Sequence, residues 1–153
     1  KKSSNLTEII TKNLETFKKN KPDFEYDIDD QEINLKIDSD LLSKIVTVIV
    51  ENAYYYNKKS VKLLKIIYIA DKNNLTINFT DNGIGINETY RENIFKPYIR
   101  INSIENVQGT GIGLLKAKKM AELIDAQIIL AESSDSGTTF QLIINTNDKK
   151  DEN

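Results

Sequence analysis

Residues 75–85 read Leu-Thr-Ile-Asn-Phe-Thr-Asp-Asn-Gly-Ile-Gly, and this stretch indicates both a strand and the point where that strand ends. Apolar and polar residues alternate in it, a period of two that predicts one face in the core. Asp81 continues the apolar face, so its carboxylate is expected on the inner side of the sheet. The Asn-Gly pair that follows is typical of a hairpin turn, but no alternating strand returns after it. We therefore interpret Asp81 as an acceptor at the floor of a pocket, where Gly83 and Gly85 let the backbone approach a flat ligand.

The segments around this stretch have the patterns of paired strands and amphipathic helices. Alternation predicts three hairpins: 24–28 with 33–37 across an acidic turn, 62–71 with 75–81, and 127–132 with 139–145. Helical spacing of apolar residues predicts helices over 3–20, 41–57 and 113–125, with a short helical stretch near 90–95. The expected fold is an α+β two-layer sandwich. Its sheet is mixed, mostly antiparallel and of about five strands, with about three helices on one face.

Composition excludes several classes of protein. The chain has 153 residues, of which 39% are hydrophobic and 29% charged, which suits one globular domain. Its net charge of −2, with Lys and Glu interleaved, gives no basic surface for a nucleic acid. Cysteine and histidine are both absent, so thiolate or imidazole metal sites, serine–histidine catalysis and a histidine phosphoacceptor are excluded within this chain. A metal ion would need oxygen ligands, which favours Mg²⁺ or Ca²⁺.

Two further features stand out against the pattern of the chain. Asn52 falls on the apolar stripe of the 41–57 helix, where it is either a solvated residue near a helix end or an oxygen ligand facing a pocket. Gly109-Thr110-Gly111-Ile112-Gly113 lies directly before a predicted helix. Its backbone N–H groups and the helix dipole would suit a phosphate, although a flexible loop is the plain alternative. Each feature alone is weak evidence of function.

Taken in order, these motifs resemble the ATP-binding domain of histidine kinases, a member of the GHKL superfamily with the Bergerat fold. Val50-Glu51-Asn52-Ala53 is similar to the N-box, and residues 81–86 and 109–114 are similar to the two glycine boxes. Residues 94–98 look like the F-box and residues 136–140 like the last glycine-box strand. The resemblance covers roughly residues 24–146.

The resemblance implies a role for each matching residue. Asn52 would hold Mg²⁺ against the ATP phosphates and act in catalysis, and Asp81 would accept a hydrogen bond from the adenine amino group. Phe95 would pin a lid over roughly residues 87–112 that closes on the phosphates. The other residues implied in nucleotide binding are Gly83, Gly85, Gly109, Thr110, Gly111, Gly113, Leu114 and Thr138.

The family also implies where this domain acts. Residues 1–20 would be the remnant of a helix from a dimerisation domain, 21–147 the ATP-binding domain, and 148–153 a disordered tail. The γ-phosphoryl group of ATP would pass to a histidine of the dimerisation domain and then to a response regulator. The isolated domain is expected to be a monomer and the full-length protein a cytoplasmic or membrane-anchored homodimer, with this domain in the cytoplasm.

Two positions depart from the family pattern and keep alternatives open. Val48 stands where the family often has a second Asn, and Tyr55 where it usually has Lys or Arg. A degenerate nucleotide-binding or interaction module without kinase activity is therefore the main alternative. A GHKL-type ATPase is disfavoured, because such enzymes carry a Glu general base at position 48. Glu51 cannot replace it, since it lies about 100° around the helix from Asn52.

Overall fold

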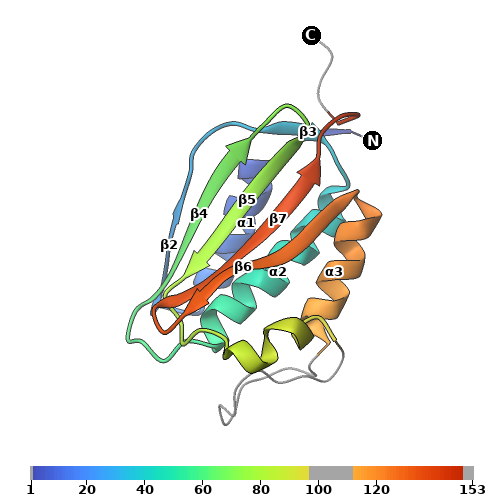
Figure 1. Ribbon diagram of the computed structural model, residues 1–153. Coiled ribbons are helices and arrows are strands. Elements are labelled where there is room, and N and C mark those ends of the chain that lie inside the picture. Colours follow the sequence, from blue (N-terminus) through green and yellow to red (C-terminus); the bar gives the residue numbers. More distant parts are fainter. Residues whose placement is uncertain (1, 97–111, 150–153) are drawn as a thin grey trace.

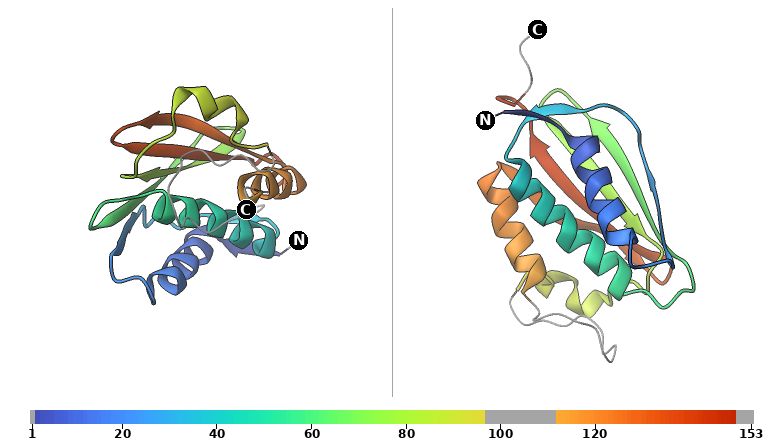
Figure 2. Two further views of the ribbon diagram at one scale, coloured as in Figure 1. Left: turned by 90° about the horizontal axis from the view of Figure 1, so that it is seen from below. Right: turned by 180° about the vertical axis from the view of Figure 1, so that it is seen from behind.

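The computed structural model describes residues 2–96 and 112–149 of the chain. Three α-helices cover one face of a five-stranded sheet (Figure 1), and Figure 2 shows all three gathered on that face. Within these ranges no helix combines the length and the apolar character needed to cross a membrane. The elements in chain order are β1 (Ser3–Asn5), α1 (Leu6–Lys18), β2 (Phe24–Ile28), β3 (Asn34–Lys36), α2 (Ser39–Tyr55), β4 (Lys62–Ala70), β5 (Asn74–Asp81), the 3₁₀-helix η1 (Glu88–Asn93), α3 (Gly113–Leu123), β6 (Ala126–Ser134) and β7 (Gly137–Asn145).

The sheet has the strand order β2-β4-β5-β7-β6, in which β2 and β4 are parallel and every other pair is antiparallel. The predicted hairpin of residues 24–28 with 33–37 is therefore wrong. β2 pairs with β4, and β3 pairs with β1 in a separate two-stranded sheet. Parallel strands need a long crossover connection, and α2 lies within the one that joins β2 to β4. The predicted hairpins β4–β5 and β6–β7 are confirmed.

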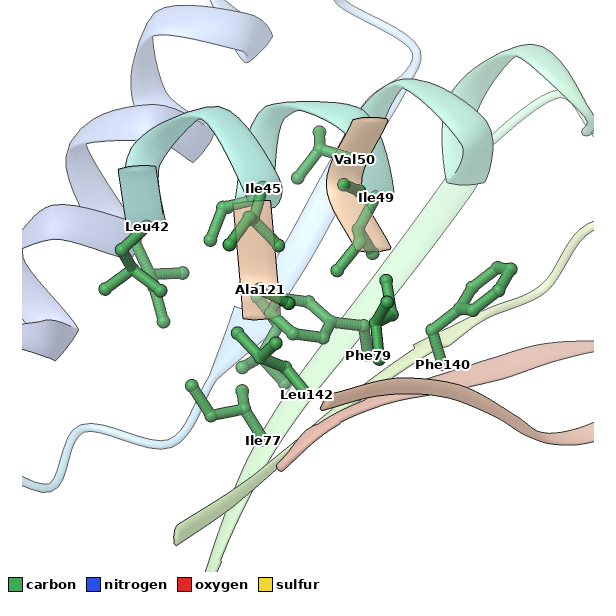
Figure 3. Close-up of a cluster of buried hydrophobic side chains, with 14 of the residues drawn as sticks. Leu42, Ile45, Ile49, Val50, Ile77, Phe79, Ala121, Phe140 and Leu142 are labelled. Carbon is green, nitrogen blue, oxygen red and sulfur yellow. The ribbon is translucent and has the colours of Figure 1, made fainter. Parts of the chain in front are cut away.

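Helix α2 lies across the middle of the sheet and supplies much of the core. Its N-terminus is capped by Asp38, whose Oδ1 accepts hydrogen bonds from the backbone N–H groups of Asp40 and Leu41, both at 3.1 Å. The helix buries an apolar stripe that faces the inward residues of β5 and β7 (Figure 3). This stripe consists of Leu42, Ile45, Val46, Ile49, Val50 and Ala53.

Helix α1 is packed into the same core. Leu6, Ile10 and Leu14 are each 0% exposed, and the Phe17 ring contacts Phe24 edge-on with centroids 5.2 Å apart. The first residues of the predicted helix over 3–20 instead form β1, because Asn5 caps α1 by accepting from the Glu8 N–H. The interpretation of residues 1–20 as a remnant from a dimerisation domain stays a prediction.

The C-terminal segment is joined to β3 by a backbone hydrogen bond. The Lys36 N–H donates to the carbonyl of Lys149 at 2.8 Å, after a turn that begins beyond Asn145. Residues 150–153 lie outside the described part of the chain, so the predicted disorder of the tail stays a prediction. β1, β3 and this turn lie together at one end of the sheet, and η1 lies at the opposite end (Figure 1).

Candidate functional site

A small pocket lies between α2, the start of α3 and the ends of β5 and β7. It encloses ≈ 20 Å³, about the room that one water molecule needs. Of the site residues predicted from the sequence, the fold brings five together here: Asn52, Asp81, Gly85, Leu114 and Thr138. The sequence did not predict the other three lining residues, Tyr56, Ile86 and Phe140.

Among the described residues, Asp81 is the only acidic one that lines this pocket. As the alternation predicted, it follows Ile77 and Phe79 on the inner face of β5. Its Oδ1 accepts hydrogen bonds from the backbone N–H groups of Gly83 at 2.9 Å and Thr138 at 3.1 Å. Burial raises the pKa of the Asp81 carboxyl to about 6, although these two bonds and the charge of Lys59 lower it. Both bonds end on Oδ1, so Oδ2 is the oxygen that can accept from a ligand.

The glycines after Asp81 are required by the protein's own backbone. A Cβ atom at Gly83 would lie 2.5 Å from the Tyr56 carbonyl oxygen. Gly85 has a φ of +78°, and a Cβ there would lie 2.0 Å from the Ser134 carbonyl oxygen. The sequence indicated that the backbone at these two glycines approaches a ligand closely. In the structure, the backbone at Gly83 lies against the C-terminal end of α2 and that at Gly85 lies against the end of β6.

Asn52 reaches the pocket from the last turns of α2 and is half-buried. Within the described residues its side chain makes one hydrogen bond, in which Nδ2 donates to the Val48 carbonyl at 3.1 Å. Its Oδ1 is therefore the atom suited to a hard cation such as Mg²⁺. The described ranges contain no group of three or more acidic side chains that could hold a metal ion. A cation at Asn52 would thus take most of its ligands from a bound molecule and from water.

The two positions that depart from the family pattern have packing contacts. Val48 faces the first turn of α3, because a Cβ added at Gly113 would lie 3.6 Å from Val48 Cγ1. The Tyr55 ring packs edge-on against Tyr54, with ring centroids 5.2 Å apart. The Val48 side chain has no group that could take or deliver a proton.

The predicted lid is described only at its two ends. Asn87 caps η1, which partly confirms the helical stretch predicted near residues 90–95, and Ile94 is buried behind it. The Phe95 ring contacts Phe140 edge-on, with centroids 6.4 Å apart. Gly113 and Leu114 begin α3, as predicted. Gly109, Thr110 and Gly111 lie outside the described residues, so their part in a site stays a prediction.

A set of polar contacts around the pocket had no signal in the sequence. Buried Asn57 donates through Nδ2 to Asn82 Oδ1 at 2.7 Å, and that oxygen also accepts from the Leu63 N–H at 2.8 Å. Ser133 on β6 accepts from the Ile86 N–H and contacts the Thr138 hydroxyl. These bonds join segments that are far apart in the sequence, and periodicity carries no information about such pairs.

The fold and the pocket together define a class: a two-layer α+β domain whose ligand pocket, between helix and sheet, contains a buried carboxylate. The sequence profile of the family described as "Histidine kinase-, DNA gyrase B-, and HSP90-like ATPase" matches residues 37–148. The chain belongs to this family. ATP is the nucleotide that membership implies.

One protein with a similar sequence is a histidine kinase. The signal transduction histidine-protein kinase ArlS of Staphylococcus aureus is 26% identical over 142 residues, which make up 90% of this chain and 31% of that protein. The chain therefore spans about a third of the length of this relative.

Two solved structures with a similar fold also come from histidine kinases. A mycobacterial sensor histidine kinase, MprB, matches with a TM-score of 0.82 and 21% identity over 95% of this chain and 98% of that one. The catalytic domain of histidine kinase ThkA matches with a TM-score of 0.79 and 21% identity over 95% and 97% of the two chains. At this identity these matches establish the shared fold, which confirms the α+β sandwich predicted from the sequence.

Proposed function

We propose that this chain is the ATP-binding catalytic domain of a sensor histidine kinase. The observation that carries the proposal is the Asp81 carboxylate, held at the pocket by two backbone amides and with one oxygen left to accept. The exocyclic amine of adenine is a donor that would pair with it. Ile86, Leu114 and Phe140 would supply apolar contacts to the purine. Because the pocket encloses only ≈ 20 Å³, Leu114 and Phe140 would move away from Ile86 when a nucleotide enters.

The phosphates of the nucleotide would lie toward Asn52 and the start of α3. Asn52 Oδ1 would be a ligand of Mg²⁺, which when bound would neutralise charge on the phosphate oxygens during transfer. The backbone N–H groups from Gly109 to Gly113 would bind phosphate oxygens at the N-terminus of α3. The domain's own contribution to catalysis would then be to position ATP and to exclude water from the transferred group.

The acceptor must come from outside this chain, because the chain contains no histidine. We propose a histidine on the dimerisation domain of the same protein, with a response-regulator aspartate as the next acceptor. A neutral imidazole is already nucleophilic near neutral pH, so transfer to it needs no general base from this domain. The full-length protein would act as a homodimer, with this domain in the cytoplasm.

Phosphoryl transfer in the full-length protein tests the proposal. With radiolabelled ATP and Mg²⁺, the protein should acquire an acid-labile, alkali-stable label, and Asp81→Asn should reduce that label roughly ten- to hundred-fold at limiting ATP. Asp135→Asn is the matched control, since it removes the same charge from the exposed β6–β7 turn and should leave labelling unchanged. Equal labelling by the Asp81→Asn variant and the parent would contradict the proposal.

Nucleotide selectivity tests the adenine contact separately. Guanine carries a carbonyl where adenine carries its amine. With GTP, two hydrogen-bond acceptors would therefore face each other, the guanine carbonyl and the Asp81 carboxylate. The parent should therefore bind ATP at least ten-fold more tightly than GTP in calorimetry. Equal affinities would show that Asp81 does not pair with the base.

A further inference from the structure

Arg91 makes two hydrogen bonds that tie the segment after β5 to β6. From the 3₁₀-helix η1, its guanidinium donates through Nε to the Ile86 carbonyl at 3.0 Å and through Nη2 to the Ser133 carbonyl at 2.7 Å. Ser133 Oγ accepts in turn from the Ile86 N–H at 2.7 Å. The Ile86 carbonyl is therefore held by the Arg91 side chain and the Ile86 N–H by the Ser133 side chain.

This arrangement is continuous with the pocket. Ile86 is 8% exposed and lines the pocket beside Asp81. On the other side of Ser133, its Oγ lies 3.0 Å from the Thr138 hydroxyl, and the Thr138 N–H donates to Asp81 Oδ1 at 3.1 Å. Hydrogen bonds and adjacent backbone thus connect Arg91 to the carboxylate proposed to bind adenine. Arg91 itself does not line that pocket.

We propose that Arg91 and Ser133 are positioning residues for nucleotide binding, which together fix the Ile86 wall and the Thr138 amide around Asp81. This inference rests on the function proposed above. The fork of the guanidinium is needed because it donates to two carbonyls at once, whereas the ammonium of a lysine is a single point charge on a flexible stem. If Ile86 is held in place before the nucleotide arrives, binding costs less free energy than it would if Ile86 had to be ordered at that moment.

Initial rates of labelling of the full-length protein, measured over a range of ATP concentrations, separate this role from a structural one. Arg91→Ala and Ser133→Ala should each raise the KM for ATP roughly ten-fold and leave kcat at saturating ATP unchanged, because the groups that touch the phosphates remain. Arg91→Lys should restore only part of the loss. Ser133→Thr, which keeps the hydroxyl, should restore most of it. The control is Lys44→Ala, which removes an exposed cation from α2, away from Arg91 and Ser133. It should change neither KM nor kcat.

The outcomes distinguish the possible failures. A residue that only stabilises the fold would lower the active fraction, so kcat would fall and KM would stay constant. That result, or full rescue by Arg91→Lys, would overturn the positioning role while leaving the proposed function intact. If the parent protein neither binds ATP nor becomes labelled, the proposed function fails and the positioning role fails with it.

Discussion

Burial raises the pKa of Asp81 to about 6 from an ordinary value of 3.8, and this has a consequence for stability. Because the folded state binds a proton more tightly than the unfolded state, the carboxyl contributes stability that is fully present below pH 3.8. That contribution is lost as the pH rises through about 6. At neutral pH the chain therefore keeps an ionised group in a place where a neutral one would be more stable. A carboxylate in such a place is typical of functional sites.

Asp81→Asn should accordingly stabilise the protein while it weakens nucleotide binding. The amide oxygen can still accept from Gly83 and Thr138, and the cost of burying a charge disappears. At pH 7.5 the free energy of unfolding should rise by on the order of 1–3 kcal/mol. Near pH 4 the difference from the parent should largely vanish. Urea unfolding at both pH values measures this difference in unfolding free energy. A variant less stable than the parent at pH 7.5 would contradict the view that burial of the Asp81 charge costs stability.

Gly85 and Gly113 were both predicted to bind nucleotide, but their surroundings differ. At Gly85, with φ at +78°, a Cβ would lie 2.0 Å from the Ser134 carbonyl oxygen. At Gly113 the nearest atom would be Val48 Cγ1 at 3.6 Å, an ordinary contact. Gly85→Ala should thus cost more than about 2 kcal/mol of unfolding free energy, and Gly113→Ala less than about 0.5 kcal/mol, since alanine favours helix. Chemical denaturation of the pair checks this, and equal losses would refute it.

At the scale of the elements, the sequence predicted where strands and helices lie and two of the three strand pairings, but not the partners of residues 24–28 and 33–37. The alternating segments 24–28 and 33–37 include Phe24, Leu35 and Ile37, which the structure buries in the core. The alternation could not show that β2 pairs with β4 and β3 with β1, because side-chain period gives the face of a strand and not its neighbour.

The same limit applies to the site. Asp81 and Asn52 interrupt apolar patterns, so both could be predicted from the sequence as candidate site residues. Arg91 and Ser133 interrupt no pattern. Ser133 meets Arg91 and Ile86 only when the end of β6 comes close to the segment that follows β5, and it lies 42 and 47 residues from them along the chain.

Helix α1 provides a prediction about the boundary of the domain. Leu14 is 0% exposed, whereas Leu123 at the end of α3 is 68% exposed. Leu14→Ala should cost about 2–5 kcal/mol of unfolding free energy, and Leu123→Ala should cost little. If α1 were a detachable linker, the two substitutions would have similar small effects in thermal unfolding. A large difference would place the start of the folding unit before residue 21.

For the whole molecule, the arrangement of the two ends of the sheet constrains how an acceptor is reached. β1 lies at the end of the sheet opposite η1 (Figure 1). The candidate pocket is lined by Ile86, which lies shortly before η1, and by Leu114 at the start of α3. If the proposed dimerisation domain precedes β1, its histidine would have to reach the pocket along the length of this layer.

Phosphate release by the purified chain distinguishes a kinase domain from an ATP-hydrolysing one. The position where hydrolysing relatives carry their general base is Val48, which packs against the start of α3. General-base help is typically worth 10²–10⁴-fold, so the purified chain with Mg²⁺ and ATP should release inorganic phosphate only at the rate of ATP in buffer. It should bind nucleotide, and without histidine it should retain no acid-labile label. Phosphate release by the chain and by its Asn52→Ala variant should be equal. Steady turnover that Asn52→Ala abolishes would make the domain an ATPase, because water would then be the acceptor.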